Sequence, residues 1–322
     1  MEKEVLLEIK NLKKYFPVKN FFGVKVGDLK AVDDVSFVIY KGETFGLVGE
    51  SGCGKSTLGR SILQMLDTDA GSVIFEGRDI ANLPKRKWKD LRSKLQIIFQ
   101  DPYSALNPNW TVAELIAEPL KNAGLSRKQC DKRVRELLQL VNMNEDDLYK
   151  FPYEFSGGQR QRIGIARAVA NYPAFIFCDE PISALDVSVQ AQVVNMLKDL
   201  QEQMGLTYLF TAHDLSMVHH ISDRIGVMYL GSMVELGTSE EVFSSPLHPY
   251  TQALISAIPI PDPELSRHSQ RLPIEGELPS PLNTPKGCRF CTRCPHATDR
   301  CMTECPEFRE VRPGHFVRCH LL

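Results

Sequence analysis

The chain has 322 residues, of which 43% are hydrophobic and 24% charged, as in an ordinary globular protein of about two domains. Its formal net charge of −2 argues against a general electrostatic affinity for nucleic acid or anionic lipid. No apolar run approaches the roughly 18 residues of a membrane-spanning helix, and the charged start MEKEVLLEIK has no secretory signal. We therefore expect any membrane role to depend on partner proteins.

The first hundred residues predict mainly strands. VLLEIKNLKKYF (residues 5–16) is typical of an edge strand, and the polar, glycine-containing stretch after it is expected to be an irregular excursion. Residues 30–49 predict two strands joined at Lys41-Gly42. GSVIFEGRDI (71–80) predicts a strand with a glycine turn, and LQIIFQ (95–100) predicts another short strand.

A glycine-rich stretch, GLVGESGCGKSTLGR (residues 46–60), fits the pattern G-x-x-x-x-G-K-[ST]. An apolar strand-like run precedes it and apolar residues at helical spacing follow it, as a phosphate-binding loop requires. Glycines let backbone N–H groups turn inward at a helix N-terminus without a Cβ clash. Lys55 adds a positive charge for the β- and γ-phosphates, and the Ser56 hydroxyl can ligate Mg²⁺. These residues predict a nucleotide site.

The middle of the chain alternates helical and strand patterns. Residues 101–170 are predominantly helical in pattern. AFIFCDE (174–180) and TYLFTAHD (207–214) are continuous apolar runs, which are typical of buried parallel strands. Residues 189–204 between them predict a crossover helix, and residues 224–237 predict a strand, a glycine turn and a second strand.

Four polar side chains follow the predicted parallel strands. Asp179 is suited to bind Mg²⁺ directly or through water, and Glu180 is suited to act as a general base toward an attacking water. The side-chain oxygen of Gln100 can reach the metal or the water, and His213 can hydrogen-bond a γ-phosphate. Open α/β sheets place their ligand sites at these carboxyl ends of strands.

A second anion-binding helix start is predicted at FSGGQRQRIGIARA (155–168). Ser156 is a good N-cap residue, and Gly157 and Gly158 expose backbone N–H groups ahead of a helix. From the residues alone, the two helix starts of this chain could bind separate phosphates.

The motifs GESGCGKST, Gln100, FSGGQ, IFCDE, SALD and His213 together resemble those of an ABC-transporter ATPase subunit. KKYFPV, DPYSALNP, HPYTQALISAIP and GCRFCTRCPHATDRC resemble the oligopeptide/dipeptide importer branch. One departure is Phe155, where the family more often has leucine; the position stays apolar. The resemblance implies an α/β P-loop fold with a mixed sheet core, an antiparallel β subdomain and a helical subdomain at about 101–170. An ATPase domain of residues 1–245 would precede a small Cys-rich extension, residues 246–322.

The resemblance also assigns roles to residues. Phe16, or Tyr15 beside it, would stack on adenine, and Asp186 would cross to the opposite active site. The segment after Gln100 would meet membrane subunits. The FSGGQ motif would complete the site of a partner ATPase. The residues implied to bind ATP or Mg²⁺ are Phe16, Gly49, Glu50, Ser51, Gly52, Cys53, Gly54, Lys55, Ser56, Thr57, Gln100, Asp179, Ser156, Gly157, Gly158, Gln159 and Asp186, and the implied catalytic residues are Glu180, His213 and Gln100.

The implied activity is ATP hydrolysis that powers peptide import. The implied partners are a second ATPase subunit, expected to be a related heterologous chain, two membrane permease subunits and, through them, an extracytoplasmic substrate-binding protein. No nucleic-acid partner is expected, and the implied location is the cytoplasmic face of the inner membrane.

Alternative functions are import of nickel or another solute, or a non-transport role in DNA repair or on ribosomes. The gap between the two nucleotide motifs is too short for the long coiled coil of DNA-repair members. The chain also has a single cassette, whereas ribosome-associated members usually have two. The filled catalytic set argues against a metal-binding regulatory module with a vestigial ATPase.

Six of the nine cysteines lie in the last 35 residues, after a proline-rich connector with seven prolines between Pro259 and Pro285. Four of the six have the spacing C-x5-C-x6-C-x17-C, which members of this branch often carry and which resembles a [4Fe–4S] ligand set. Zn²⁺ is the competing interpretation, and free thiols are a third. The choice of ligands stays open because Cys291 and Cys305 are also present. The implied ligands are Cys288, Cys294, Cys301 and Cys319.

Overall fold

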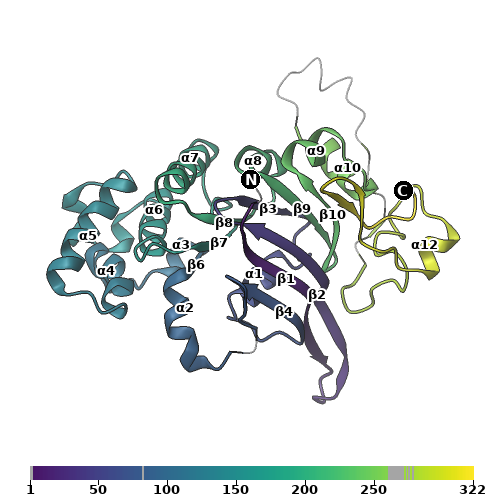
Figure 1. The fold of residues 1–322 in the computed structure, drawn as a ribbon, viewed down its shortest axis with the longest axis horizontal. Helices are drawn as coiled ribbons and strands as arrows, with labels where there is room; N and C mark the ends of the chain where they lie inside the picture. The colour runs from purple at the N-terminus through teal and green to yellow at the C-terminus, as the bar shows by residue number, and fades with distance from the viewer. Residues whose placement is uncertain (1–2, 82, 260–271, 273, 275, 278) are drawn as a thin grey trace. The chain divides into compact units, whose positions relative to one another are not determined.

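The computed structural model of the chain describes residues 3–81, 83–259, 272, 274, 276–277 and 279–322. The fold divides into two units, whose elements are labelled in Figure 1. Unit 1 consists of Met1–Glu4, Tyr40–Thr44 and Asn82–Ala212, and unit 2 consists of Val5–Ile39, Phe45–Ala81 and His213–Leu322.

Unit 2 contains an antiparallel sheet with the strand order β2-β1-β4-β5. The predicted edge position of the first strand is wrong, because β1 lies between β2 and β4 (Figure 1). The buried residues Leu7, Ile9 and Leu12 are separated by polar residues that are partly or fully exposed, so the pattern resembles that of an edge strand although both edges are paired. The expected excursion is also mostly strand. The strands are β1 (Val5–Lys19), β2 (Lys25–Tyr40), β4 (Ala70–Phe75) and β5 (Arg78–Asp79).

A second, mixed set of strands in unit 2 has the order β3-β9-β10-β12-β11. β3 runs parallel to β9, whereas the pairs β9-β10, β10-β12 and β11-β12 are antiparallel. The predicted strand, glycine turn and strand at 224–237 is confirmed. These strands are β3 (Thr44–Val48), β9 (Arg224–Tyr229), β10 (Ser232–Thr238), β11 (Arg309–Arg312) and β12 (His315–Val317). The helices of unit 2 are α1 (Lys55–Ile62), α8 (Leu215–Ile221), α9 (Ser239–Ser244), α10 (Pro249–Ser256) and α12 (Asp299–Thr303).

Unit 1 contains three parallel strands in the order β8-β7-β6. They are β6 (Leu95–Ile98), β7 (Phe175–Asp179) and β8 (Thr207–Thr211). All residues of β7 and β8 are buried, which explains their continuous apolar runs. The predicted crossover helix between them is α7 (Val187–Met204).

The rest of unit 1 is helical, as predicted for residues 101–170. Capping boxes at Thr111 and Ser126 satisfy free N–H groups and define where α4 and α5 begin. In Figure 1 these helices lie beside α6. The elements are η1 (Lys85–Lys87), α2 (Trp88–Lys94), α3 (Pro102–Ala105), α4 (Val112–Asn122), α5 (Arg127–Leu140), η2 (Glu145–Tyr149), η3 (Pro152–Glu154) and α6 (Gly157–Ala168).

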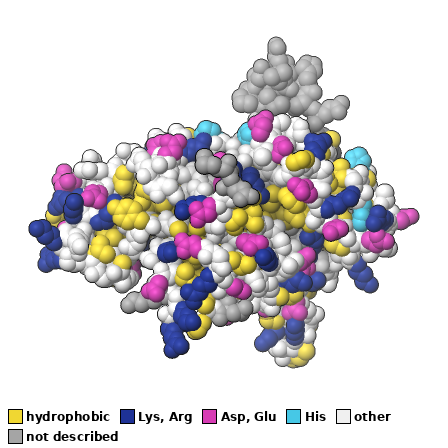
Figure 2. Space-filling view, viewed as in Figure 1, with side chains coloured by type: hydrophobic (Ala, Val, Ile, Leu, Met, Phe, Trp, Pro, Cys, Tyr) yellow, Lys and Arg dark blue, Asp and Glu magenta, His cyan; other side chains and the backbone are white. Residues whose placement is uncertain are grey.

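Every helix in the described part of the chain is too short or too polar to cross a bilayer. On the face shown in Figure 2, positive and negative side chains are interspersed, in keeping with the small net charge. Much of the predicted proline-rich connector lies outside the described residues.

Candidate functional site

The glycine-rich loop of unit 2 joins β3 to α1 in a conformation that depends on glycine. Gly49, Gly52 and Gly54 have φ of 151°, 78° and 108°. A Cβ atom on Gly49 would lie 2.2 Å from the Met228 carbonyl oxygen, and one on Gly54 would lie 2.0 Å from the Ala31 carbonyl oxygen. The loop therefore packs directly on neighbouring backbone, and only glycine fits these two positions.

The Lys55 ammonium lies inside this loop. Its Nζ donates hydrogen bonds to the carbonyl oxygens of Gly49 at 2.8 Å and Glu50 at 3.3 Å, and the side chain is buried. Cys53 is buried 3.9 Å from the same nitrogen, and burial raises the pKa of its thiol. Ser56 and Thr57, in the first turn of α1, are partly exposed. The loop thus presents a lysine charge and hydroxyl groups at a helix N-terminus, the arrangement that binds phosphate oxygens.

Two residues that the sequence interpretation missed hold Glu50 in this loop. Its backbone N–H donates a 2.9 Å hydrogen bond to the Tyr250 hydroxyl, and its carboxylate accepts bonds of 2.9 and 3.2 Å from Arg293. Both lie in motifs, HPYTQALISAIP and GCRFCTRCPHATDRC, that carried the family resemblance. No local pattern indicated that either side chain reaches the loop.

Of the two candidate adenine-stacking residues on β1, Tyr15 is engaged elsewhere. Its hydroxyl donates to the Asp33 carboxylate, and burial together with this carboxylate raises the pKa of Tyr15. Asp33 also accepts a hydrogen bond from Arg289. The neighbouring ring of Phe16 is partly exposed and has the Lys14 ammonium 5.3 Å from its centroid. This arrangement favours Phe16 as the stacking residue.

In unit 1, the structure brings Gln100 and Glu180 together. The Gln100 Nε2 donates a 2.8 Å hydrogen bond to the Glu180 carboxylate. Glu180 has a left-handed backbone with φ of 48°, and its N–H donates to the Thr211 hydroxyl at 2.9 Å. Asp179 and Glu180 are both buried at the end of β7. His213 is an exposed residue of unit 2, just before α8.

The FSGGQ motif of unit 1 forms the predicted capped helix start. The Ser156 hydroxyl accepts from the Gln159 N–H at 3.3 Å, and the Gln159 side chain accepts from the Ser156 N–H at 3.0 Å. A Cβ on Gly158 would lie 2.5 Å from a Val189 methyl group, so glycine permits close packing on α7. Ser156, Gly157, Gln159 and Asp186 are exposed, and a second chain can therefore reach them.

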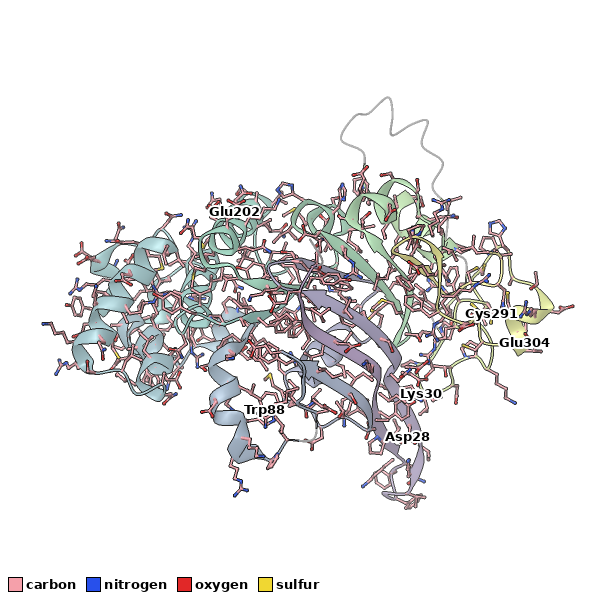
Figure 3. All side chains as sticks on the ribbon, viewed as in Figure 1. Asp28, Lys30, Trp88, Glu202, Cys291 and Glu304 are labelled. Carbon is pink, nitrogen blue, oxygen red and sulfur yellow. The ribbon has the colours of Figure 1, made fainter. Side chains whose placement is uncertain are left out.

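The predicted metal site in the cysteine tail is not supported by the structure. Among the described residues, no group of three or more His, Cys, Asp or Glu side chains is placed to hold a metal ion. Burial, followed by the neighbouring cysteines, raises the pKa of Cys288 to about 12, and burial also raises the pKa of Cys294 and Cys319. Figure 3 labels Cys291 in this tail.

Comparisons with known proteins agree with this geometry. The ABC transporter family model matches residues 32–183, and the model of the oligopeptide/dipeptide transporter C-terminal region matches residues 234–301. The oligopeptide transport ATP-binding protein AppF of Bacillus subtilis (strain 168) is 52% identical over 321 residues, which cover 99% of this chain and 98% of AppF. OppF of Salmonella typhimurium, also an oligopeptide transport ATP-binding protein, is 51% identical over 320 residues, 98% of this chain and 95% of OppF.

Solved structures share the fold. The dimeric post-hydrolysis structure of the ATP-binding cassette MJ0796 with ADP and Pi has a TM-score of 0.66 and 28% sequence identity. The match covers 73% of this chain and 99% of that cassette. CbiO1 from Clostridium perfringens, part of the complex cbiONQ, has a TM-score of 0.66 and 26% identity, over 76% of this chain and 92% of that protein.

Proposed function

Because this chain belongs to the ABC transporter ATPase family, we propose that it hydrolyses ATP to power the import of di- or oligopeptides through a membrane transporter. The observation that carries the proposal is the glycine loop with the Lys55 ammonium bonded inside it. The C-terminal family match and the oligopeptide transport relatives support peptides as the cargo.

The residues present fit ATP and Mg²⁺. The loop has no room for a Cβ at Gly49 or Gly54 and presents its lysine to an incoming phosphate group. The family resemblance assigns Mg²⁺ to oxygen atoms of Ser56, Gln100 and Asp179, which are the kind of ligand that this ion prefers. When bound, the ion neutralises charge on the phosphate oxygens.

Glu180 is the proposed general base. The hydrogen bond from Gln100 fixes its carboxylate, and the N–H bond to Thr211 fixes its backbone. Held in this way, Glu180 takes the proton of the attacking water. His213 is proposed to hydrogen-bond the γ-phosphate.

The exposed FSGGQ motif and Asp186 support turnover by a pair of cassettes. In this proposal, each chain binds ATP on its own loop and contributes its FSGGQ helix start to the site of the other. ATP then holds the pair together, and loss of the γ-phosphate contacts after hydrolysis lets the two part. The second ATPase subunit is proposed to be a related chain.

A cavity of about 190 Å³ in unit 1 supports a docking position for the membrane permeases. It is lined by residues that follow Gln100, including Pro102 and Leu106. In the wall of this cavity, the Arg167 guanidinium donates hydrogen bonds to the Glu118 carboxylate at 2.7 Å and to the Ala105 carbonyl oxygen at 3.0 Å. Two permease subunits, connected to an extracytoplasmic binding protein, would place this chain at the cytoplasmic face of the membrane, where ATP is available.

A metal cofactor in the extension, residues 246–322, is a separate proposal. Its support is the C-x5-C-x6-C-x17-C spacing of the tail cysteines, together with the 2.8 Å hydrogen bond from the Cys288 N–H to the Cys301 carbonyl oxygen, which holds two of them close together. The full chain, purified without oxygen, is analysed for iron and zinc and by visible absorption. A brown, iron-containing sample supports [4Fe–4S], a colourless zinc-containing one supports Zn²⁺, and a metal-free one contradicts both.

The main test measures binding of a fluorescent ATP analogue with Mg²⁺ to the full chain, and peptide-stimulated ATPase in vesicles with its permeases. Lys55→Ala is expected to weaken nucleotide binding about a hundredfold or more, because a charge-assisted phosphate contact is lost. Lys25→Ala, which removes an exposed lysine of the same unit, is the control. Undiminished binding by Lys55→Ala, or full ATPase activity by a chain that never pairs, would contradict the proposal.

A further inference from the structure

Glu50 is the second residue of the phosphate loop and the only acidic residue within residues 49–57. Its carbonyl oxygen is bonded by the Lys55 ammonium, its N–H by the Tyr250 hydroxyl and its carboxylate by Arg293. The Arg293 side chain is 9% exposed and that of Glu50 is 27% exposed. The pair is therefore shielded from solvent more than an ordinary surface ion pair.

Arg293 is itself held by a buried aromatic cluster, formed by Tyr229, Tyr250 and Phe290. Its guanidinium donates to the Tyr229 hydroxyl at 3.4 Å, and its backbone N–H donates to the Phe290 carbonyl oxygen at 3.0 Å. The Phe290 ring centroid is 5.3 Å from that of Tyr229 and 5.4 Å from that of Tyr250. Since all three rings are fully buried, the arginine is presented to Glu50 from a rigid base.

The negative charge of Glu50 affects how the loop binds a triphosphate. A carboxylate in a loop that receives a triphosphate repels the phosphates unless it is neutralised. Within the described part of the chain, no other side chain donates a hydrogen bond to this carboxylate. Arg293 supplies the compensating charge from a segment 243 residues away in the sequence.

We propose that Arg293 is a positioning residue for nucleotide binding, which neutralises and orients Glu50 so that the phosphate loop accepts ATP. The proposal rests on ATP being the ligand of this loop. It makes the cysteine-rich tail part of the nucleotide site, so that a displaced tail lowers ATP affinity.

The test is a double-mutant cycle on the full chain with Arg293→Ala, Glu50→Gln and the double variant, read out as the Kd of a fluorescent ATP analogue with Mg²⁺. Arg293→Ala is expected to weaken binding about tenfold, because the carboxylate stays without its counter-charge. Glu50→Gln is expected to tighten binding about threefold, and the double variant to regain most of the affinity that Arg293→Ala loses. Arg293→Lys, which keeps the charge, is expected to lie between wild type and Arg293→Ala.

Two further readouts separate positioning from a merely structural role. The Arg293→Ala defect is expected to shrink as salt is raised from low to high ionic strength, because repulsion is screened. In the reconstituted transporter, KM for ATP should rise in proportion to Kd, whereas kcat changes by less than about twofold. Arg300→Ala, which removes an exposed arginine paired with Glu304 in the same tail, is the matched control (Figure 3 labels Glu304).

The proposal is overturned if Arg293→Ala lowers thermal stability while its Kd stays within about twofold of wild type. It is equally overturned if the double variant binds as weakly as Arg293→Ala. Should Arg293→Ala fail to fold, Glu50→Gln decides, since weaker binding than wild type contradicts the proposed repulsion. Lys55→Ala distinguishes failure of the proposed function from failure of this inference. Retained binding in Lys55→Ala refutes this loop as the ATP site, whereas lost binding in Lys55→Ala with normal binding in Arg293→Ala refutes only the role of Arg293.

Discussion

The side-chain amide of Gln100 is bonded to the carboxylate of Glu180 at 2.8 Å, although the two residues are 80 positions apart. The register of two parallel strands explains this contact. Ile98 of β6 is paired with Cys178 of β7, and each polar residue follows two positions later. Both therefore leave the sheet at the same edge, where Gln100 can hold Glu180 in one orientation.

Replacing Glu180 by glutamine is expected to lower kcat for ATP hydrolysis about 10²- to 10⁴-fold, because the amide cannot take a proton from water. Nucleotide binding should persist. The measurement is phosphate release by the reconstituted transporter, alongside the Kd for ATP. Glu202→Gln, at an exposed position of α7, serves as the control (Figure 3). A normal rate in Glu180→Gln would show that another group is the base.

Replacing Ser156 by arginine is expected to lower transporter ATPase activity about a hundredfold or more. The arginine side chain would block the helix start that, in the proposal, binds the ATP of the partner chain. Loss of the N-cap bond should cost about 1 kcal/mol of stability. The isolated chain should still bind ATP on its own loop. If the variant retains ATPase activity when paired, sharing of sites between two chains is refuted.

Acid is expected to destabilise the C-terminal part through His248. Burial lowers the pKa of this imidazole to about 4, from 6.5, although the nearby Glu235 carboxylate opposes the shift. The unfolded chain therefore binds more protons between these two pH values. The contribution of the neutral His248 imidazole to the free energy of unfolding is fully present above about pH 6.5. This contribution, about 3 kcal/mol, is lost as the pH falls toward 4.

The measurement is urea denaturation of wild type and His248→Asn between pH 7 and pH 4.5. His248 accepts a hydrogen bond from the Tyr250 N–H at the start of α10, and asparagine can make the same cap. The difference in unfolding free energy between the two proteins should shift in favour of the variant as the pH falls. A constant difference would contradict the role of this group.

Glu235 is expected to be essential for the stability of unit 2. Its fully buried carboxylate accepts from the N–H groups of Leu247 and His248 at 2.8 and 2.9 Å and lies 2.8 Å from His315 Nε2. Glu235→Ala leaves these groups buried without their acceptor, which should cost about 3–5 kcal/mol. The midpoint of urea denaturation measures the loss, and Glu307→Ala, at an exposed position, is the control. A shift no larger than that of the control would refute this assignment.

The sequence by itself determined those parts of the site whose conformation depends only on neighbouring residues. Glycine spacing predicted the phosphate loop, because left-handed φ and close backbone contacts admit no other residue at Gly49 and Gly54. Ser156 predicted a helix start because an N-cap uses only its neighbours. The edge assignment of β1 failed for the complementary reason: alternation reports which face is buried and says nothing about which strands lie on either side.

Tertiary structure alone decided how the loop is supported. Tyr250 and Arg293 contact Glu50 from 200 and 243 residues away, and their own neighbours in sequence give no sign of it. It also decided that the Tyr15 hydroxyl is bound to the Asp33 carboxylate, a contact that the sequence did not indicate. Periodicity and spacing record local hydrogen bonding and burial, whereas contacts between distant side chains depend on how the strands pair and the helices pack.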